Sequence, residues 1–264
     1  MTKNGLIIAG FDPSAGAGLL MDLKVFSAIG IYSFAVPTAI VEENTDTVNS
    51  ITPVTPSVLR GQLDILLRKS RVHGVKIGML STGKTANIIQ ETIHRYRLKN
   101  IVLDPVLASS GGSSLSRGDI KYAINALLPF CTIVTPNIPE ASVLSGVEIK
   151  NKDDMMLSAK YFLDKGAEAV VIKGGHFVQK GLDLYLDGKQ HMFFEAKALN
   201  KDVHGTGCIL SSAITAYLIK GYDKPVAVKR AKLFTLAAIK NSRRVSPSLH
   251  RLVGMPHTIN KNNK

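Results

Sequence analysis

The segment His204-Gly205-Thr206-Gly207-Cys208 has a clear capacity for chemistry. Apolar residues recur at helical spacing after it, which predicts a helix that begins at or just after the glycines. Free amides at a helix start bind anions, and glycines let a phosphate approach the backbone closely. The helix dipole is expected to lower the pKa of the Cys208 thiol and so make it a better proton acceptor. A kinase needs such a base beside the accepting hydroxyl. The alternative, from these residues alone, is a tight turn with a buried cysteine.

Two further segments follow apolar runs that read as strands. Asn137 and Glu140 come after residues 131–135, and an amide and a carboxylate there could order Mg²⁺ and its waters near a triphosphate. The alternative is a turn that leads into the first turn of a helix. Lys173 ends the run 169–172 and could reach a nucleotide phosphate as a point charge, or could simply keep the edge of a sheet soluble.

Asp22 lies on an apolar helical stripe with Leu19, Leu23 and Phe26. A carboxylate on a buried edge costs free energy unless something hydrogen-bonds to it. It could therefore bind an amine or hydroxyl of a ligand, or it could reach solvent at the margin of the stripe.

Two competing nucleotide motifs can be weighed directly. No GxxxxGK[ST] segment is present, which excludes a P-loop. Residues 16–21 (GAGLLM) imitate a dinucleotide fingerprint, but Met21 is too bulky for the close packing that the third glycine position requires.

These segments need a scaffold, and the sequence alternates short β-branched runs with longer amphipathic ones. Strands are predicted at 6–10, 34–41, 75–78, 100–104, 131–135 and 169–173, and helices near 18–29, 57–70, 85–96, 119–128, 152–165, 206–220 and 225–240. Wholly apolar strands between helices indicate a mainly parallel sheet covered on both faces. Asp187-Gly188, inside the strand-like stretch 182–196, predicts an antiparallel edge hairpin. The predicted fold class is α/β, with one three-layer domain over residues 1–241 and a basic, loosely attached tail over 242–264.

Composition limits the classes of protein that fit. Of the 264 residues, 45% are hydrophobic and 20% charged, enough for a full core. No apolar run has the roughly 18 to 20 residues that a membrane span needs, and the first apolar run is too short for a signal peptide. Two cysteines without metal spacing favour a reducing cytoplasm. The net charge of +13 is scattered and is not interleaved with aromatic residues, which argues against nucleic acid and favours a solvated basic surface, although such an excess can also steer anionic metabolites into a cleft. The partner is expected to be a small-molecule substrate.

Taken in order, the segments resemble the hydroxymethylpyrimidine and phosphomethylpyrimidine kinases of thiamine synthesis. The matching segments are residues 10–18, 22–30, 38–45, 76–80, 104–106, 135–141, 173–176, 204–208 and 230–232. The resemblance implies a ribokinase-like sandwich, commonly a homodimer, that uses ATP and Mg²⁺ to phosphorylate hydroxymethylpyrimidine and then its monophosphate. Many ribokinase relatives carry an aspartate base after Gly-Thr-Gly, whereas this branch carries cysteine.

The resemblance also implies a role for individual residues. It assigns the pyrimidine pocket to Gly10, Asp22, Glu43, Met79 and Val106, and ATP binding to Asp104, Asn137, Lys173, Thr206 and Lys232. It implies that Asp104 and Glu140 serve the metal, and that Cys208 is the base beside Gly205 and Gly207.

The chain departs from this family around the acceptor. The family usually has glutamine where this chain has Glu43, and an ionised glutamate can accept hydrogen bonds but not donate them. Phe11 replaces a small polar residue, and residues 108–111 lack the usual lysine. The alternative functions are a pyridoxal or pyridoxine kinase on the same scaffold, and a ligand-binding regulator that has lost catalysis.

Overall fold

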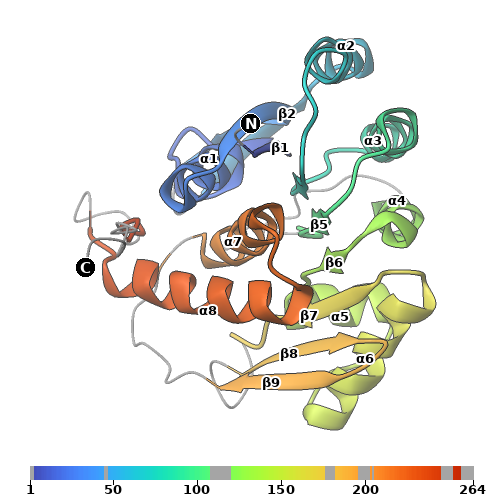
Figure 1. The fold of residues 1–264 in the computed structure, drawn as a ribbon, viewed down its shortest axis with the longest axis vertical. Coiled ribbons are helices and arrows are strands. Elements are labelled where there is room, and N and C mark those ends of the chain that lie inside the picture. Colours follow the sequence, from blue (N-terminus) through green and yellow to red (C-terminus); the bar gives the residue numbers. More distant parts are fainter. Residues whose placement is uncertain are drawn as a thin grey trace.

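The structure is a computed structural model that describes residues 3–44, 47–107, 120–175, 182–195, 203, 205–244 and 252–256. Within these residues nine strands form one sheet, in the order β3-β2-β1-β4-β5-β6-β7-β8-β9 (Figure 1). The strands are β1 (Asn4–Phe11), β2 (Tyr32–Glu43), β3 (Val48–Pro53), β4 (Val75–Ile77), β5 (Ile101–Leu103), β6 (Ile133–Val134), β7 (Ala169–Ile172), β8 (Leu182–Asp187) and β9 (His191–Glu195). The helices are α1 (Gly18–Ile29), α2 (Pro56–Leu67), α3 (Gly83–Tyr96), α4 (Ile120–Leu127), α5 (Ile138–Ser145), α6 (Lys152–Asp164), α7 (Thr206–Lys220) and α8 (Lys224–Lys240), with a 3₁₀ turn, η1 (Leu128–Phe130), after α4.

The order of the strands reverses at β1, because β2 lies on one side of it and β4 on the other. Strand β1 pairs in parallel with β2 on one side and with β4 on the other, and β5, β6 and β7 continue in parallel from β4. In open α/β sheets, ligands bind beyond the carboxyl ends of the strands where the strand order reverses. The loops after β1 and β4 therefore frame the expected crevice.

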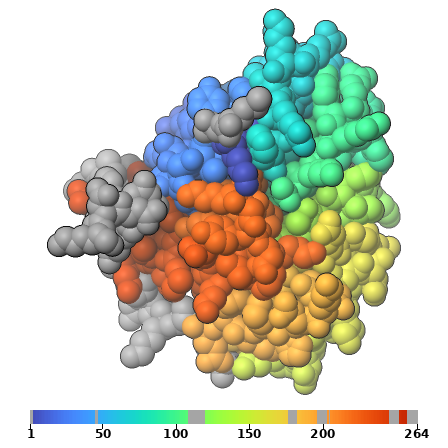
Figure 2. All heavy atoms as spheres, in the orientation of Figure 1, coloured from blue at the N-terminus to red at the C-terminus, as the bar shows by residue number. Residues whose placement is uncertain are grey.

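Two cores form because successive strand residues face opposite sides of the sheet. Leu6 and Ile8 of β1 pack into the core that contains α2, α3, α4 and α6. Ile7 and Ala9 pack into the core that contains α1, α7 and α8. Figure 1 shows these two helix layers on opposite faces, and in Figure 2 the orange region that contains α7 and α8 lies between the blue N-terminal segment and the light-orange edge hairpin.

The prediction of a mainly parallel sheet with an antiparallel edge is confirmed. Strand β8 pairs antiparallel with both β7 and β9, and Leu186 pairs with His191 across the predicted turn. The Asp187 side chain shapes that turn by accepting hydrogen bonds from the backbone N–H groups of Lys189 and Gln190. The edge strand β3 was not predicted, and the helix α5 was given only as the alternative interpretation of Asn137 and Glu140.

Part of the predicted tail is described, and it lies against the domain. Arg243 forms an antiparallel bridge with Leu252, and Val253 and Met255 pack against the core of α1, α7 and α8. The boundary between residues 241 and 242 stays a prediction. Among the described residues, no helix combines the length and apolar character needed to cross a bilayer.

Candidate active site

Two glycine-containing loops meet at the start of α7. Gly205 has a left-handed backbone (φ +81°), and a Cβ atom there would lie 1.9 Å from the carbonyl oxygen of Gly16. Only glycine satisfies both conditions. The predicted helix begins at Thr206, so its free amides lie beside the loop that follows β1.

Cys208 lies in the first turn of α7 and is half-buried. The backbone N–H of Gly18, the first residue of α1, donates a hydrogen bond to its sulfur. Two helix N-termini therefore converge on one thiol.

The acidity of this thiol differs from the sequence-based expectation. Burial raises the pKa of Cys208 to about 12, and the charges of Asp22 and Asp104 act in the same direction, while Lys76 acts against them. The expected lowering of the thiol pKa is wrong for the free protein, because the loss of solvent outweighs the positive groups around the sulfur.

Asp104 and Lys173 form an ion pair beyond the ends of β5 and β7. The Lys173 ammonium lies 2.7 Å from Asp104 Oδ1, and Ser211 on α7 donates a hydrogen bond to Asp104 Oδ2 at 3.0 Å. Burial favours protonation of Asp104, but Lys173 and Lys76 outweigh it and hold the pKa of this carboxyl below its ordinary value. A Cβ atom on Gly207 would lie 3.1 Å from Lys173 Nζ, so the lysine reaches the glycine loop.

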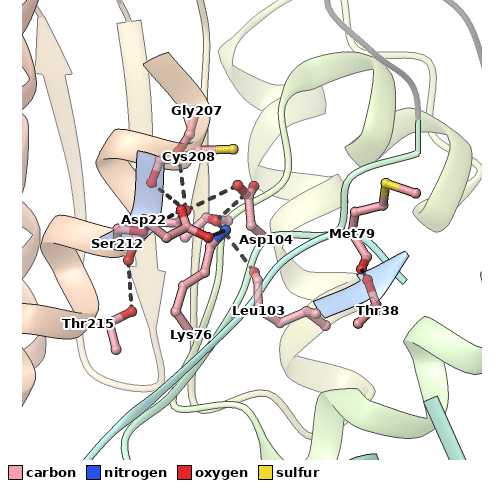
Figure 3. Close-up of polar contacts among 12 residues, drawn as sticks. Asp22, Thr38, Lys76, Met79, Leu103, Asp104, Gly207, Cys208, Ser212 and Thr215 are labelled. Carbon is pink, nitrogen blue, oxygen red and sulfur yellow. Dashed lines mark hydrogen bonds and ion pairs between the residues drawn. The ribbon is translucent and has the colours of Figure 1, made fainter. Parts of the chain in front are cut away.

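The surroundings of Asp22 differ from both interpretations of the sequence, because Asp22 neither faces solvent nor has a free oxygen for a ligand. Its Oδ2 lies 2.6 Å from Lys76 Nζ, and the side chains of both residues are 0% exposed. Ser212 on α7 donates a 2.7 Å hydrogen bond to Asp22 Oδ1. Figure 3 shows Asp22, Lys76 and Asp104 close together, with Cys208 nearby. Both Asp22 oxygens are therefore bound within the protein.

An apolar group lies on the β1 side of the crevice. Ala39, Val41 and Met79 form a small core with Val106 packed against it. Gly10 adjoins this group, because a Cβ atom there would lie 3.0 Å from the sulfur of Met79. The structure thus brings Gly10, Met79 and Val106 together on one wall.

Glu43 ends β2, two residues beyond Val41. It is half-buried, whereas Glu42 beside it is exposed. Burial, followed by the negative charge of Asp12, raises the pKa of Glu43 to about 7. At neutral pH this carboxyl can therefore donate a hydrogen bond in a large share of the molecules.

Asn137 and Glu140 form the capping box of α5. Asn137 Oδ1 accepts from the backbone N–H of Glu140, and Glu140 Oε2 accepts from that of Asn137, both at 2.8 Å. Asn137 also forms a parallel bridge with Lys173. Burial raises the pKa of Glu140 to about 7, against the charge of Lys173.

Among the described residues, no group of three or more His, Cys, Asp or Glu side chains could enclose a metal ion. Mg²⁺ usually keeps several waters and binds proteins through one or two carboxylates together with substrate phosphates.

Lys232 on α8 is tied to the segment after Lys173. It forms an ion pair with Asp183 Oδ2, while Asp183 Oδ1 accepts a 2.9 Å hydrogen bond from the backbone N–H of Gly174. Helix α8 is thereby fixed next to the carboxyl end of β7.

The sequence interpretation missed three polar residues of this site: Lys76, Ser211 and Ser212. A lysine between Val75 and Ile77 in a buried strand was the available signal for Lys76, because a charge there requires a partner. The serines gave none, since buried helical serines without functional partners are common. Thr45, His176, His204 and residues 108–111 lie outside the described residues.

The sheet, its crevice at β1 and β4, and the glycine-lined start of α7 beside Asp104 and Lys173 define a kinase of the ribokinase-like class. The comparisons with known proteins give the family. A family model described as phosphomethylpyrimidine kinase matches residues 12–252.

A hydroxymethylpyrimidine/phosphomethylpyrimidine kinase of Aquifex aeolicus is 40% identical over 245 residues, which are 91% of this chain and 95% of the relative. The crystal structure of a phosphomethylpyrimidine kinase from Clostridium difficile superposes with a TM-score of 0.82 at 36% identity, covering 90% of this chain and all of that one (100%). An ADP complex of Bacillus subtilis pyridoxal kinase superposes with a TM-score of 0.88 at 34% identity, covering 97% of this chain and 98% of that one. The chain belongs to the phosphomethylpyrimidine kinase family and is an ATP-dependent kinase.

Proposed function

We propose that this enzyme phosphorylates hydroxymethylpyrimidine on its primary hydroxyl and then phosphorylates the monophosphate to the diphosphate used in thiamine biosynthesis. The family match over residues 12–252 carries this proposal. The curated relative from Aquifex aeolicus is named for both steps, and this chain spans 95% of it.

The acceptor pocket in this proposal lies on the β1 side of the crevice. Gly10, Met79 and Val106 supply an apolar wall for the pyrimidine ring, and Glu43 supplies the polar group that orients it. A protonated Glu43 both donates and accepts, as a glutamine amide does, so it can pair with a ring nitrogen and an amino group together. Both oxygens of Asp22, the fifth residue predicted for this pocket, are bound within the protein by Lys76 and Ser212.

The phosphoryl donor binds on the other side, where ATP supplies the group to be transferred. Lys173, Asn137, Thr206 and Lys232 bind its phosphates and orient them, with Asp104 fixed by Lys173. Asp104 and Glu140 would hold Mg²⁺, which would neutralise charge on the phosphates. The amides of Gly205, Gly207 and Cys208 stabilise the charge on the transferring group.

Cys208, in its thiolate form, accepts the proton of the attacking hydroxyl. The Gly18 N–H, the start of α7 and the nearby lysines favour the thiolate, while burial and the two carboxylates oppose it. Because burial raises the pKa of this thiol to about 12 in the free protein, most of it is protonated at neutral pH.

We further propose that the enzyme works in the cytoplasm as a homodimer. The absence of a membrane-crossing helix among the described residues and the two unpaired cysteines, Cys131 and Cys208, are compatible with this setting.

Mass-spectrometric product analysis tests the function. Purified enzyme is given ATP, Mg²⁺ and, in parallel reactions, hydroxymethylpyrimidine, its monophosphate and pyridoxal. We expect conversion of both pyrimidines, with diphosphate as the final product. No pyrimidine product, under conditions where ATP binds, would refute the proposal.

A pyridoxal kinase is the second candidate. The similarity to the Bacillus subtilis pyridoxal kinase over 97% of this chain, together with Glu43 in place of glutamine, favours considering it. Conversion of pyridoxal alone in the same set of reactions would select this candidate. A ligand-binding regulator would show no turnover with any acceptor.

A further inference from the structure

Lys76 is a buried charge that the proposed function places in contact with neither the acceptor nor ATP or Mg²⁺. It belongs to the central strand β4, and its side chain and that of its partner Asp22 are 0% exposed. Replacing a buried ion pair by apolar residues of similar volume is often neutral or stabilising, so stability alone does not account for this pair.

The surroundings of Lys76 are built to hold an ammonium. Val75 and Ile77 pack into the core on the α2 and α3 face, which turns Lys76 toward the layer of α1 and α7. A Cβ atom on Gly78 would lie 2.7 Å from Lys76 Nζ, so glycine leaves the space that the ammonium occupies. The net effect of Asp22, Cys208 and Asp104 raises the pKa of Lys76 above its ordinary value, against the effect of burial.

The Lys76–Asp22 pair connects the two helices that hold the thiol. Asp22 lies on α1, and its second oxygen accepts the hydrogen bond from Ser212 on α7. The first residue of α1, Gly18, donates its N–H to the sulfur of Cys208, which lies in the first turn of α7. The buried pair of Lys76 and Asp22, together with Ser212, thus links β4, α1 and α7 beside Cys208 (Figure 3).

The charges that act on the sulfur come from different elements. Lys76 on β4 favours the thiolate, whereas Asp22 on α1 and Asp104 after β5 oppose it. Lys173 after β7 also interacts electrostatically with Cys208, but it is paired with Asp104. The effect of Lys76 on the pKa of the thiol is larger than the opposite effect of its partner Asp22. The Lys76–Asp22 pair as a whole therefore favours the thiolate of Cys208.

We propose that Lys76 is a positioning residue for phosphoryl transfer, whose ammonium, anchored by Asp22, is the fixed positive charge that stabilises the thiolate of Cys208. This inference rests on the proposed function, in which Cys208 is the base. It assigns opposite effects to the two members of one ion pair. Lys76 promotes the reactive form of the thiol, and Asp22 restrains it while holding Lys76 in place.

The test is the pH dependence of Cys208 alkylation by iodoacetamide, read peptide by peptide by mass spectrometry so that Cys131 is counted separately. Wild type is compared with Lys76→Met, Asp22→Asn and the double variant. Lys76→Met is expected to raise the apparent thiol pKa by about one unit or more, the usual effect of losing an opposite charge at close range. Asp22→Asn is expected to shift it downward.

The double variant keeps the test decisive if Lys76→Met fails to fold. It differs from Asp22→Asn only in the charge of Lys76, so its alkylation should be about tenfold slower than that of Asp22→Asn at the same pH. kcat should fall by about tenfold alongside it, since one pH unit changes the thiolate fraction tenfold. Unchanged alkylation profiles, or shifts of the same sign in both single variants, would overturn the inference, because a purely structural pair predicts no opposition.

This outcome is separable from a failure of the proposed function. Alkylation reports the thiol without any turnover. If Cys208→Ala retains turnover while the opposite shifts are observed, Lys76 controls the thiol but Cys208 is not the base, which would refute the role in phosphoryl transfer. If Cys208→Ala is inactive and the shifts are absent, the base stands and Lys76 has no part in it.

Discussion

Replacing Glu43 by glutamine should remove the pH dependence with which the proposed acceptor pocket binds hydroxymethylpyrimidine. Glu43 is half-buried at the end of β2, next to Asp12, and its pKa is raised to about 7. A pyrimidine that offers both a ring nitrogen and an amino group needs one donor and one acceptor from this side chain. Only the form with a proton between Glu43 and the ring satisfies both, whichever of the two carries it.

The magnitude follows from the titration. Above pH 7 the Kd of the wild type for hydroxymethylpyrimidine should rise by up to about tenfold per pH unit, approaching a hundredfold between pH 6 and 9. The Glu43→Gln variant should bind with a Kd that changes little over this range. Isothermal titration calorimetry at four pH values measures this directly, without dependence on the chemical step.

Stability provides an independent measurement with a definite sign. The folded protein keeps the Glu43 proton up to about pH 7, whereas the unfolded chain loses it near its ordinary value of 4.5, so the free energy of unfolding falls as pH rises between these values. The full pKa difference corresponds to about 3 kcal/mol, and solvent screening of a half-buried group reduces this to about 1–2 kcal/mol. Urea unfolding should therefore show Glu43→Gln to be more stable than wild type at pH 8 and close to it at pH 4.5.

Glu42→Gln is the matched control, since it removes the same charge from the exposed neighbour, whose carboxylate accepts a 2.9 Å hydrogen bond from the side chain of Asn49. It should leave both pH profiles as they are in the wild type. A wild-type Kd that stays constant from pH 6 to 9, or a Glu43→Gln profile that still rises, would refute the assignment of Glu43 to acceptor binding.

Three further substitutions test other parts of the site. Cys208→Ala should lower kcat by at least about a hundredfold in steady-state kinetics and leave the ATP affinity, measured by calorimetry, within about twofold of the wild type. Cys131→Ala removes a core thiol and should keep turnover. Surviving activity in Cys208→Ala would show that Cys208 is not the base. Gly205→Ala should destabilise the protein by more than about 2 kcal/mol in urea and abolish activity, because it combines a left-handed backbone with a contact of 1.9 Å to Gly16, whereas Gly61→Ala, with open space around it, should be neutral or slightly stabilising. Lys232→Met should raise the KM for ATP by about tenfold with a smaller effect on kcat, because it leaves Asp183 beside Gly174 without its ion pair. Lys229→Met, at an exposed position of the same helix, should leave the KM for ATP as it is in the wild type. An unchanged KM in Lys232→Met would show that Lys232 has no part in nucleotide binding.

The sequence was sufficient for the parallel core because its strands are continuously apolar and its helices periodic. It was insufficient for β3, whose residues 48–53 alternate weakly and include Pro53, so the edge strand is set by pairing with β2 rather than by its own pattern. Helix α5 was given only as the alternative interpretation of Asn137 and Glu140, because the eight residues after Asn137 carry little amphipathic signal, although the capping box was readable.

The site illustrates a different limit. Gly205, Gly207 and Cys208 could be found because glycines and a helix pattern adjoin in the sequence, and the structure places them beside Lys173 and Asp104 as the strand ends predict. The acidity of the thiol could not be found in this way, because it depends on how much solvent the fold removes and on charges from β4 and α1. The local helix dipole predicted a shift of one sign, and burial imposed the other.

The residues proposed to bind the acceptor are separate from those proposed to bind the phosphoryl donor, so the choice of acceptor can be assigned to one part of the site. The residues proposed to bind the phosphoryl donor lie after β5, β6 and β7, at the start of α7 and on α8, while those proposed to bind the acceptor lie at the ends of β1 and β2 and after β4 and β5. The buried ion pair of Lys76 and Asp22 joins β4 to α1 next to the thiol of Cys208. A change such as glutamine to Glu43 can therefore alter which ring is bound, and at which pH, without disturbing the residues that bind the donor phosphates. On this reasoning, a preference of this enzyme for a pyrimidine or for pyridoxal is set at the wall formed by Gly10, Glu43, Met79 and Val106 rather than at the base.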